Sequence, residues 1–530
     1  MCWTLLVYDV DWTHENQHLI RTWIDWIKKN INRWKNAYWI SIFFEDGTSI
    51  SHIDTKIEWL SNKVSEYKSS HSKKIVAILW HARYATSGKM KWKLHLSSWQ
   101  PVMIDIDFDW EVRTLWFVFN GNKWNAWEVA EEYDFHNKYN IGIPILDTEV
   151  IKYVIIEYVQ ANPGCTLSEI HKHINTIMKW ASNMIMLDKN WVVAWTDEEW
   201  VRFLPMSYSE EKGLMVVSSE SSFLDALTKS IKDSQTVLTA WQQIVIDRKD
   251  LFDWNWEYSH SINEVWPIEN YVENKVKTRL CAFEFLYLMG RESLKSYKIR
   301  ELAGRKLAQK ETEEIIDWEC LVFHAPHTAF DVAKWFSDEL WVDFETDSLY
   351  KMSKDRIFMS QIDDRMEQMK LIYQINYEAI SELPKKYPNL KKIFLLDDTI
   401  VNGITGKYLV TLLKDALRNA YWREIEIHFR VWAFTVWSDC EDWAVMNQEQ
   451  LVMQEYCENA LFPTPEEIDN ISREFLKSDS LWFLTFEDIE ELILEHIIKY
   501  QYYKKLDNVS ICRKCHDWTK SWIHKEKTPA

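Results

Sequence analysis

The chain has 530 residues, which is enough for two or three domains with sizeable cores. It carries 62 basic and 81 acidic side chains, and the resulting net charge of −19 argues against nucleic acid or an anionic membrane as its main partner. We expect neither a signal peptide nor a membrane span, since no long apolar run occurs, and the eight cysteines suit a reducing, cytoplasmic location.

Short apolar stretches separated by polar turns predict strands in the first part of the chain, at residues 37–44, 74–79, 114–119, 184–187, 192–194 and 214–217. Helical periodicity predicts helices over 147–160 and 167–179. This mixture predicts an α+β layered domain over residues 2–260. The polar, irregular segment 255–265 is predicted to be a linker.

From about residue 280 helices and strands alternate. Helices are predicted at 297–310, 329–339 and 407–420, and strands at 320–324, 391–396 and 424–431. This βαβ rhythm is typical of a parallel sheet, so residues 261–495 are predicted to form an α/β domain. The tail, 496–530, is basic and polar and contains Cys512 and Cys515.

Glycine and tryptophan occur in unusual numbers. At the ordinary frequency of about 7% the chain would hold roughly 37 glycines, yet it has 10 glycines and 32 tryptophans. Some bacterial lineages read UGA as glycine, and a table that reads UGA as tryptophan would produce this exchange. The alternative is a tryptophan-rich protein with an aromatic binding surface. Under the glycine hypothesis, the positions to examine are Trp34, Trp39, Trp80, Trp443, Trp482 and Trp518.

Cys2 directly follows the initiator methionine. Removal of Met1 would leave a free α-amino group, a weak base near neutral pH, on the residue that carries the thiol. One residue would then supply both nucleophile and base. A second-position cysteine taken alone is more often inert.

Further motifs follow Cys2 in a fixed order: Met1-Cys2-Trp3, Arg33-Trp34-Lys35-Asn36-Ala37-Tyr38-Trp39, Trp80-His81-Ala82-Arg83-Tyr84-Ala85-Thr86, Gln100-Pro101, Asn120-Gly121-Asn122 and Asp147-Thr148-Glu149. With glycine in place of Trp3, Trp34, Trp39 and Trp80, this series resembles the class II, N-terminal-nucleophile glutamine amidotransferases. The resemblance implies a four-layer αββα Ntn-hydrolase glutaminase domain.

The resemblance also implies roles for individual residues. Cys2 would attack the glutamine amide, and the Asn120 amide and Gly121 N–H would form the oxyanion hole. Arg83 would hold the substrate α-carboxylate and Asp147 its α-ammonium. Taken singly, Arg83 would be read as a surface ion pair and Asn120-Gly121 as a hairpin turn. Asn36 and Phe119 depart from the family's usual Asp and His.

Residues 391–406 read as a strand, an acidic pair, a loop of small residues and a helix. Two carboxylates at the carboxyl end of a strand, Asp397 and Asp398, can bind ribose hydroxyls or, through Mg²⁺, a pyrophosphate. The loop N–H groups and the helix N-terminus favour a 5′-phosphate. The string resembles the signature of type I phosphoribosyltransferases, specifically the amidophosphoribosyltransferases, and implies a Rossmann-like domain.

Other segments extend this resemblance over nearly the whole chain: Ser219-Glu220-Ser221 with Asp225, Cys281-Ala282-Phe283-Glu284-Phe285, Ala325-Pro326-His327-Thr328, Arg356-Ile357-Phe358 with Arg365, and Ser480-Leu481-Trp482-Phe483-Leu484. It implies Mg²⁺ ligation by Thr328 with Asp397 and Asp398. The substrate-binding residues it implies are Thr399, Gly403, Thr405, Arg356 and Arg365. Asn402, Ile404 and His327 depart from the family pattern, which would weaken or alter the transferase half.

Cys512 and Cys515 form a Cys-x₂-Cys pair that by itself suits zinc, a redox pair or neither. A subset of amidophosphoribosyltransferases holds a [4Fe–4S] cluster on four cysteines, and Cys281, Cys440, Cys512 and Cys515 stand at the matching places. The resemblance therefore implies an iron–sulfur cluster, with zinc as the alternative.

In these enzymes glutamine hydrolysis releases ammonia, which passes inside the protein to attack C1 of phosphoribosyl pyrophosphate. The products are 5-phosphoribosylamine, glutamate and pyrophosphate, in the first committed step of purine synthesis. The resemblance also implies purine-nucleotide feedback and a homo-oligomer. Two alternatives are another class II amidotransferase, such as a sugar-phosphate aminotransferase, and a weakly catalytic homologue that senses phosphoribosyl pyrophosphate or nucleotides.

Overall fold

The computed structural model describes these parts of the chain: residues 3–9, 37–54, 73–83, 89–90, 93–94, 100–108, 111–123, 125–140, 146–178, 180–188, 191–196, 204–209, 214–219, 235–238, 243–247, 278–283, 285–286, 296–326, 329–352, 365–438, 440, 451–458, 463–499 and 509–516. The chain divides into two compact units. The first comprises Met1–Leu280 with Lys505–Ser510, and the second comprises Cys281–Lys504 with Ile511–Ala530. The domain boundary predicted near residue 260 and the linker at 255–265 lie outside the described residues.

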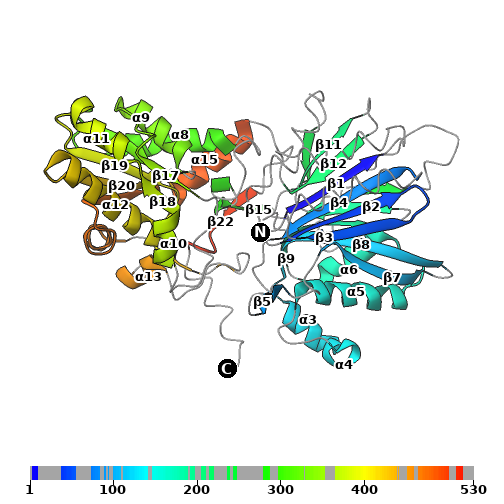
Figure 1. The fold of residues 1–530 in the computed structure, drawn as a ribbon. Helices are drawn as coiled ribbons and strands as arrows, with labels where there is room; N and C mark the ends of the chain where they lie inside the picture. The colour runs from blue at the N-terminus through cyan, green and yellow to red at the C-terminus, as the bar shows by residue number, and fades with distance from the viewer. Residues whose placement is uncertain are drawn as a thin grey trace. The chain divides into compact units, whose positions relative to one another are not determined.

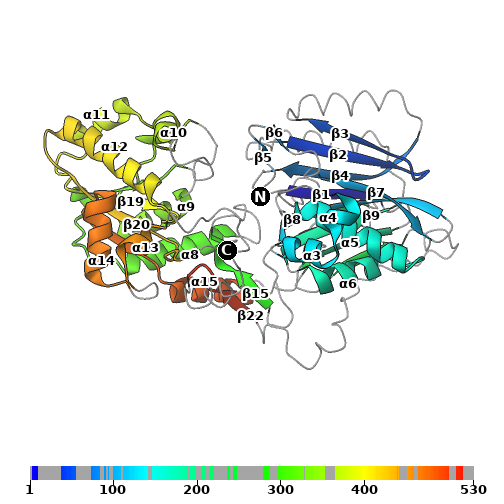
Figure 2. The same ribbon diagram turned by 90° about the horizontal axis from the view of Figure 1, so that it is seen from below.

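Two sheets dominate the first unit (Figures 1 and 2). In sheet order, the seven-stranded sheet consists of β13 (Gln235–Leu238), β11 (Leu204–Ser209), β12 (Leu214–Ser218), β1 (Trp3–Asp9), β4 (Ile75–Arg83), β2 (Ala37–Phe44) and β3 (Ser49–Asp54). The five-stranded sheet consists of β14 (Gln243–Asp247), β10 (Trp191–Thr196), β9 (Trp180–Leu187), β8 (Glu111–Lys123) and β7 (Val102–Phe108). A small hairpin joins β5 (Lys89–Met90) to β6 (Lys93–Leu94).

Helices cover the outer face of the five-stranded sheet: α3 (Ala126–Glu132), α4 (Phe135–Tyr139), α5 (Asp147–Ala161) and α6 (Leu167–Ile177). One apolar core joins these helices to that sheet through residues such as Ile151, Ile170 and Phe117. A second core, with Leu6, Leu79 and Val118, lies between the two sheets. Three of the four predicted layers are therefore present in the described residues, and apolar burial between them stabilises the stack.

The second unit is built on a parallel sheet in the order β16 (Cys320–His324), β19 (Lys392–Asp397), β20 (Glu426–Val431) and β21 (Ser480–Phe483). Its helices are α8 (Ser296–Gln309), α9 (Phe330–Leu340), α10 (Arg365–Ile372), α11 (Tyr377–Lys386), α12 (Ile404–Tyr421), α13 (Val452–Tyr456), α14 (Pro465–Asn470) and α15 (Phe486–Lys499). Shorter elements are the 3-10 turn η6 (Asp317–Glu319), the π-helical turn η10 (Ile471–Leu476), and the paired strands β17 (Leu349–Lys351) and β18 (Tyr373–Ile375). The paired strands β15 (Thr278–Cys281) and β22 (Val509–Cys512) each contain residues of both units, because the division falls after Leu280 and after Ser510.

Helices pack on both faces of this parallel sheet. Phe394 of β19 lies opposite His428 of β20 and packs against Phe336 of α9. Phe429, the next residue along β20, points to the other face, where a Cβ added to Gly406 of α12 would meet its ring at 2.8 Å. Because neighbouring strand residues point to opposite faces, α9 and α12 cover the two sides of the sheet. Among the described helices, none is long and apolar enough to cross a membrane.

Candidate functional site

In the first unit, the strand that follows Cys2 lies in the middle of the seven-stranded sheet. Trp3 pairs with Ala82 and Thr4 with His81, so β1 begins beside the end of β4, where Arg83 is the last strand residue. Cys2 itself and the Arg83 side chain lie outside the described residues. Strand pairing nevertheless places the backbone of Trp3, which follows the predicted nucleophile, next to Ala82, which precedes the predicted carboxylate-binding Arg83.

The start of β1 is also held from its other side. The Thr4 N–H donates to Ser219 Oγ at 3.1 Å, and the Ser219 N–H donates to the Thr4 carbonyl at 3.0 Å. Ser219 opens the Ser-Glu-Ser segment that the sequence had singled out. These two hydrogen bonds join the Ser-Glu-Ser segment to the start of β1, although the two are 215 residues apart in the sequence.

Asn120 and Gly121, the predicted oxyanion-hole residues, lie in β8 of the five-stranded sheet, which contacts β1. Asn120 is 5% exposed, and its buried side-chain Oδ1 has no hydrogen-bond partner among the described residues. The preceding residue, Phe119, donates its N–H to the buried Gln100 Oε1 at 2.7 Å, and Gln100 precedes a cis proline, Pro101. An unpaired buried oxygen costs stability, and because it is an acceptor it could bind only a donor group, whereas the predicted oxyanion role would use the amide N–H.

Asp147 is the first residue of α5, where a carboxylate is stabilised by the helix dipole. Its Oδ1 accepts the Thr148 N–H at 2.8 Å. A cavity of about 490 Å³ lies next to it and is lined by residues that include Thr148, Glu149, Trp39 and Trp116. Asp147 itself is not one of the residues that line this cavity, and its distance from the Cys2 thiol falls outside the described residues.

In the second unit, the acidic pair lies at the carboxyl edge of the parallel sheet. Asp397 ends β19 and is 4% exposed, and Asp398 is 9% exposed. The Asp398 N–H donates to Asp397 Oδ1 at 2.8 Å. The Trp432 and Ala433 N–H groups donate to the Asp397 and Asp398 carbonyls at 3.4 and 3.1 Å. The pair is therefore fixed by the neighbouring chain at the edge where ligands of open α/β sheets bind.

The loop after the acidic pair has a conformation that requires glycine. Gly403 has φ +62° and precedes α12, and a Cβ there would meet Phe475 Cε1 at 2.4 Å. Thr399 Oγ1 is buried and has no hydrogen-bond partner among the described residues. Thr405 lies in the first turn of α12. Loop, hydroxyl groups and helix N-terminus form an arrangement that suits a phosphate.

Asn402, which departs from the family pattern, contributes to the same turn. Its Oδ1 accepts the Ile404 N–H at 3.2 Å. One of the N–H groups at the start of α12 is therefore already satisfied by the chain. The remaining predicted residues are only partly described. The loop from Ala325 begins beside the acidic pair, because the Ala325 N–H donates to the Leu396 carbonyl at 2.7 Å. His327, Thr328 and Arg356 lie outside the described residues, as does the side chain of Arg365, the first residue of α10.

The four predicted cluster cysteines all belong to the second unit and are 6–7% exposed. Cys281 and Cys512 are the last residues of β15 and β22, which pair in a two-stranded sheet. The Cys515 carbonyl accepts the N–H groups of Trp437 and Ser438 at 2.9 and 3.2 Å, two residues before Cys440. Among the described residues, no group of three or more His, Cys, Asp or Glu side chains is arranged to hold a metal ion.

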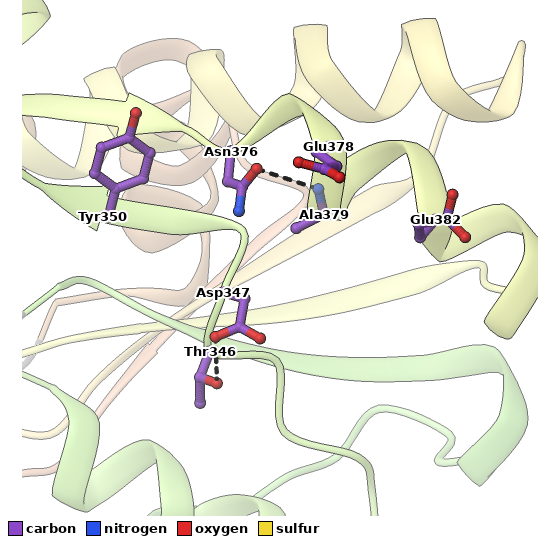
Figure 3. Close-up of a pocket in the computed structure, with 7 residues that line it drawn as sticks. All are labelled: Thr346, Asp347, Tyr350, Asn376, Glu378, Ala379 and Glu382. Carbon is purple, nitrogen blue, oxygen red and sulfur yellow. Dashed lines mark hydrogen bonds between the residues drawn. The ribbon is translucent and has the colours of Figure 1, made fainter.

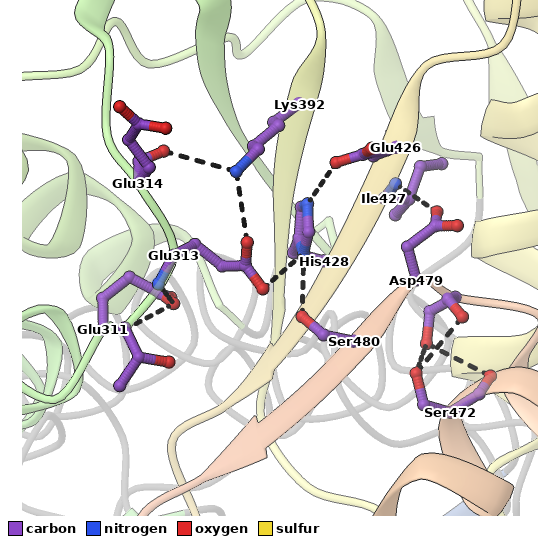
Figure 4. Close-up of polar contacts among 12 residues, drawn as sticks. Glu311, Glu313, Glu314, Lys392, Glu426, Ile427, His428, Ser472, Asp479 and Ser480 are labelled. Atoms are coloured by element: carbon purple, nitrogen blue, oxygen red, sulfur yellow. Dashed lines mark hydrogen bonds and ion pairs between the residues drawn. The ribbon is translucent and has the colours of Figure 1, made fainter.

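Sequence reasoning missed a polar cluster on β20. Arg430 is fully buried and donates to both carboxylate oxygens of Glu311, at 2.6 and 3.0 Å. Figure 4 shows His428 between Glu313, Glu426 and Ser480, with Nδ1 2.8 Å from Ser480 Oγ. Burial and the nearby Arg430 charge lower the pKa of His428. The alternation of charged and apolar residues in β20 was the available signal, but it reads as an ordinary half-exposed strand.

A further hollow of about 500 Å³ in the second unit contains no predicted site residue. It is lined by Thr346, Asp347, Tyr350, Asn376, Glu378, Ala379 and Glu382 (Figure 3). The Asn376 side chain facing it already caps α11 by accepting the Ala379 N–H at 3.2 Å. The carboxylates that line this hollow are typical of a solvated helix end. Nothing among the described residues that line it marks the hollow as a second site.

Comparison with known proteins completes the description. No protein-family model matches the chain. It is 23% identical over 382 residues to the amidophosphoribosyltransferase of Staphylococcus epidermidis, a match that covers 70% of this chain and 66% of that protein. It is 22% identical over 423 residues to the amidophosphoribosyltransferase of Archaeoglobus fulgidus, covering 79% of each.

Among solved structures, the chain is similar to glutamine phosphoribosylpyrophosphate amidotransferase from B. subtilis complexed with ADP and GMP. The TM-score is 0.66 at 17% identity, covering 97% of this chain and 96% of that one. The predicted fold class is thereby confirmed: the chain has the fold of a class II glutamine amidotransferase domain followed by a phosphoribosyltransferase domain.

Proposed function

We propose that the protein is an amidophosphoribosyltransferase, converting glutamine, phosphoribosyl pyrophosphate and water to 5-phosphoribosylamine, glutamate and pyrophosphate. The observation that carries this proposal is that one chain combines the glutaminase fold with a buried acidic pair and glycine loop at the edge of a parallel sheet. A glutaminase alone would not need the second arrangement, and a phosphoribosyltransferase alone would not need the first. The relatives' shared name supports the same conclusion.

In the first half-reaction the Cys2 thiolate attacks the glutamine amide carbon. The Asn120 side-chain N–H and the Gly121 N–H stabilise the oxyanion, ammonia leaves, and water hydrolyses the thioester to glutamate. Arg83 and Asp147 hold the two charged groups on the substrate's α-carbon. The cavity lined by Thr148 and Glu149 would widen if position 39 carried glycine, because the Trp39 side chain also lines it.

In the second half-reaction ammonia attacks C1 of phosphoribosyl pyrophosphate, and the C1–O bond to pyrophosphate breaks. Thr399, Gly403 and Thr405 would bind the 5′-phosphate, while Arg356 and Arg365 would contact the pyrophosphate. Asp397 and Asp398 would bind Mg²⁺ with Thr328. Mg²⁺ is commonly held by one or two carboxylates together with substrate phosphates, so the paired carboxylates fit it without a larger set of protein ligands. Bound Mg²⁺ would neutralise the charge that develops on the leaving pyrophosphate.

Cys281, Cys440, Cys512 and Cys515 are the thiolates that would hold a [4Fe–4S] cluster, with zinc as the alternative, because four thiolates are the usual donors for either. The four thiols are buried within one unit, but among the described residues they are not gathered into a group arranged to hold a metal ion, so the assignment rests on the sequence resemblance. The cluster would tie the tail to the transferase unit. Purine nucleotides as effectors, a homo-oligomer and a place at the first committed step of purine synthesis complete the proposal.

The motif tryptophans would be glycine in the translated protein. Of the six, Trp39, Trp80 and Trp482 lie in described strands, and none of them has a positive φ. Conformational freedom is therefore not the reason for glycine at these three positions, which leaves close approach of backbone to ligand or neighbour. Trp34, Trp443 and Trp518 lie outside the described residues.

The experiment measures pyrophosphate release with glutamine or with ammonia as nitrogen donor, in wild type, in Cys2→Ala and in Cys165→Ala. Cys165 is a matched control because it is a buried core thiol of the same unit. We expect Cys2→Ala to lose only the glutamine-dependent reaction, while Cys165→Ala retains both. Wild-type protein that releases no pyrophosphate with either donor would defeat the proposal and leave the sensing homologue.

A further inference from the structure

Two helices of the second unit end in a tryptophan with left-handed backbone. Trp341 follows α9 with φ 58° and ψ 34°, and Trp422 follows α12 with φ 56° and ψ 25°. The Trp422 N–H donates to the Arg418 carbonyl at 2.9 Å, and the Trp341 N–H donates to the Ser337 carbonyl. Val342, after Trp341, donates to the same Ser337 carbonyl at 3.1 Å. These bonds satisfy the last carbonyls of each helix, so the left-handed turn belongs to the helix end itself.

Tryptophan is poorly suited to this position. In the left-handed region the Cβ of an L-residue crowds its own carbonyl oxygen, and glycine, which has no Cβ, is the usual residue there. Among the described residues, three other non-glycine residues have positive φ: Asp134, Asn140 and Lys477. Asp and Asn tolerate the region because their short polar side chains bond locally, which an indole ring cannot do. Lys477, which ends η10, has no such compensation either, so positive φ counts against tryptophan here together with the exposure of the ring.

The two indole rings are not stabilised by burial in the fold. Trp341 is 87% exposed and Trp422 is 90% exposed. Trp318, Trp127 and Trp482 are 63%, 45% and 41% exposed. Burial of an aromatic ring is the main way in which tryptophan stabilises a protein. At 341 and 422 the strain is therefore not offset by packing.

We infer that the translated protein carries glycine at positions 341 and 422, each encoded by UGA read as glycine. The backbone carries this inference independently of any family motif, since neither position was among the six that the motifs indicated. It also stands apart from the proposed function, because both tryptophans lie at helix ends and neither is among the predicted site residues. The shortage of glycine and the excess of tryptophan, 10 against 32, agree with it.

The opposing explanation is a pair of true tryptophans that form an aromatic binding surface. The first experiment separates the two by peptide mass spectrometry of the protein purified from its natural source, together with reading the two codons. We expect glycine masses at both positions and TGA codons. Tryptophan masses or TGG codons at 341 and 422 would overturn the inference.

A second experiment tests the backbone argument with recombinant protein that carries tryptophan as printed. Trp341→Gly and Trp422→Gly are each compared with the alanine variant at the same position, which also removes the ring but keeps a Cβ. We expect each glycine variant to raise the folded-to-unfolded ratio, by roughly tenfold relative to alanine.

Trp318→Gly is the matched control, because Trp318 is exposed but does not have a positive φ. There we expect glycine to lower the unfolding midpoint, since it adds only freedom to the unfolded chain. If Trp341→Gly and Trp422→Gly lowered the midpoint as this control does, the structural basis of the inference would fail.

Discussion

The two candidate sites are assembled in different ways. In the first unit the predicted residues come from the position just before β1 in the sequence, the end of β4, the last third of β8 and the first turn of α5. In the second unit most of them come from one stretch, Asp397 to Thr405, at the end of a single parallel strand. A site built from distant segments depends on sheet register, whereas a site built from one loop depends on local backbone geometry. Variants of the two sites should therefore fail differently.

The largest effect is expected in the first site, for Asn120→Ala. Loss of one oxyanion donor costs roughly 10² to 10³ in kcat. Only the glutamine-dependent reaction should fall, since ammonia bypasses that step, so the ratio of glutamine-driven to ammonia-driven pyrophosphate release is the measurement. A parallel loss of both reactions would show that Asn120 supports the fold and not the oxyanion.

Asp398→Asn should have the opposite signature. Contacts with charged groups contribute about 1.5–3 kcal/mol, so both glutamine-driven and ammonia-driven synthesis should fall about tenfold to a hundredfold. Glutamine hydrolysis in the absence of phosphoribosyl pyrophosphate should be unchanged. Synthesis that falls with glutamine yet persists with ammonia would contradict the separation of the two sites.

Gly403→Ala tests whether the second site depends on local geometry. The new Cβ would be strained by φ +62° and would meet Phe475, and overpacking of this kind costs about 1–3 kcal/mol. We expect a lower denaturant midpoint with an unchanged slope. Adding Phe475→Ala should recover part of the loss beyond the sum of the single effects, because the two side chains occupy the same space. Additive losses would place the cost elsewhere.

The smallest effect concerns pH and the second unit alone. Burial, then the Arg430 charge, lowers the pKa of His428 below its ordinary 6.5, so the folded state disfavours the protonated ring. Stability is then full above the unfolded pKa and falls as the pH drops below about 6.5 toward the folded value. The groups that face the ring are Glu313, Glu426, Arg430 and Ser480.

The check is the unfolding midpoint of wild type and of His428→Asn between pH 7 and pH 5. We expect a shallower decline in the variant, which retains a partner for Ser480 but does not take up a proton. A second titrating group, the Glu311 carboxylate, contributes at lower pH: burial tends to raise its pKa, but the hydrogen bonds from Arg430 prevail and hold that pKa below 4.5. Identical slopes for the two proteins would exclude His428 as the source.

Much of the fold could be read from local pattern. Strands β2 and β16 were predicted to the residue, since both are short apolar runs bounded by polar turns. Strand β4 was predicted to end at Leu79 but extends to Arg83, because pairing with β1 and β2 keeps residues 80–83 extended. Tertiary pairing of this kind leaves no signal in the strand's own residues.

The start of helix α12 was also predicted inaccurately from local pattern, in this case because of glycines. Its start was predicted at Lys407, because Gly403 and Gly406 read as loop, yet it begins at Ile404. Gly406 lies inside the helix, where α12 approaches β20 so closely that a Cβ would meet Phe429 at 2.8 Å, so glycine serves packing there and does not mark a loop. The acidic loop could be predicted as a site because its residues are contiguous. The grouping of β1, β4 and β8 required the sheets, and the paired strands β17 and β18 were too short to predict.

The bonds from Trp432 and Ala433 to the carbonyls of Asp397 and Asp398 have one further consequence. They continue the inter-strand ladder past the end of β19, so neither aspartate can rotate its peptide plane without rupturing that ladder. The backbone of the acidic pair is thus held in one conformation before any ligand binds. Any change of backbone conformation on binding a sugar phosphate must then occur in the turn from Thr399 to Gly403.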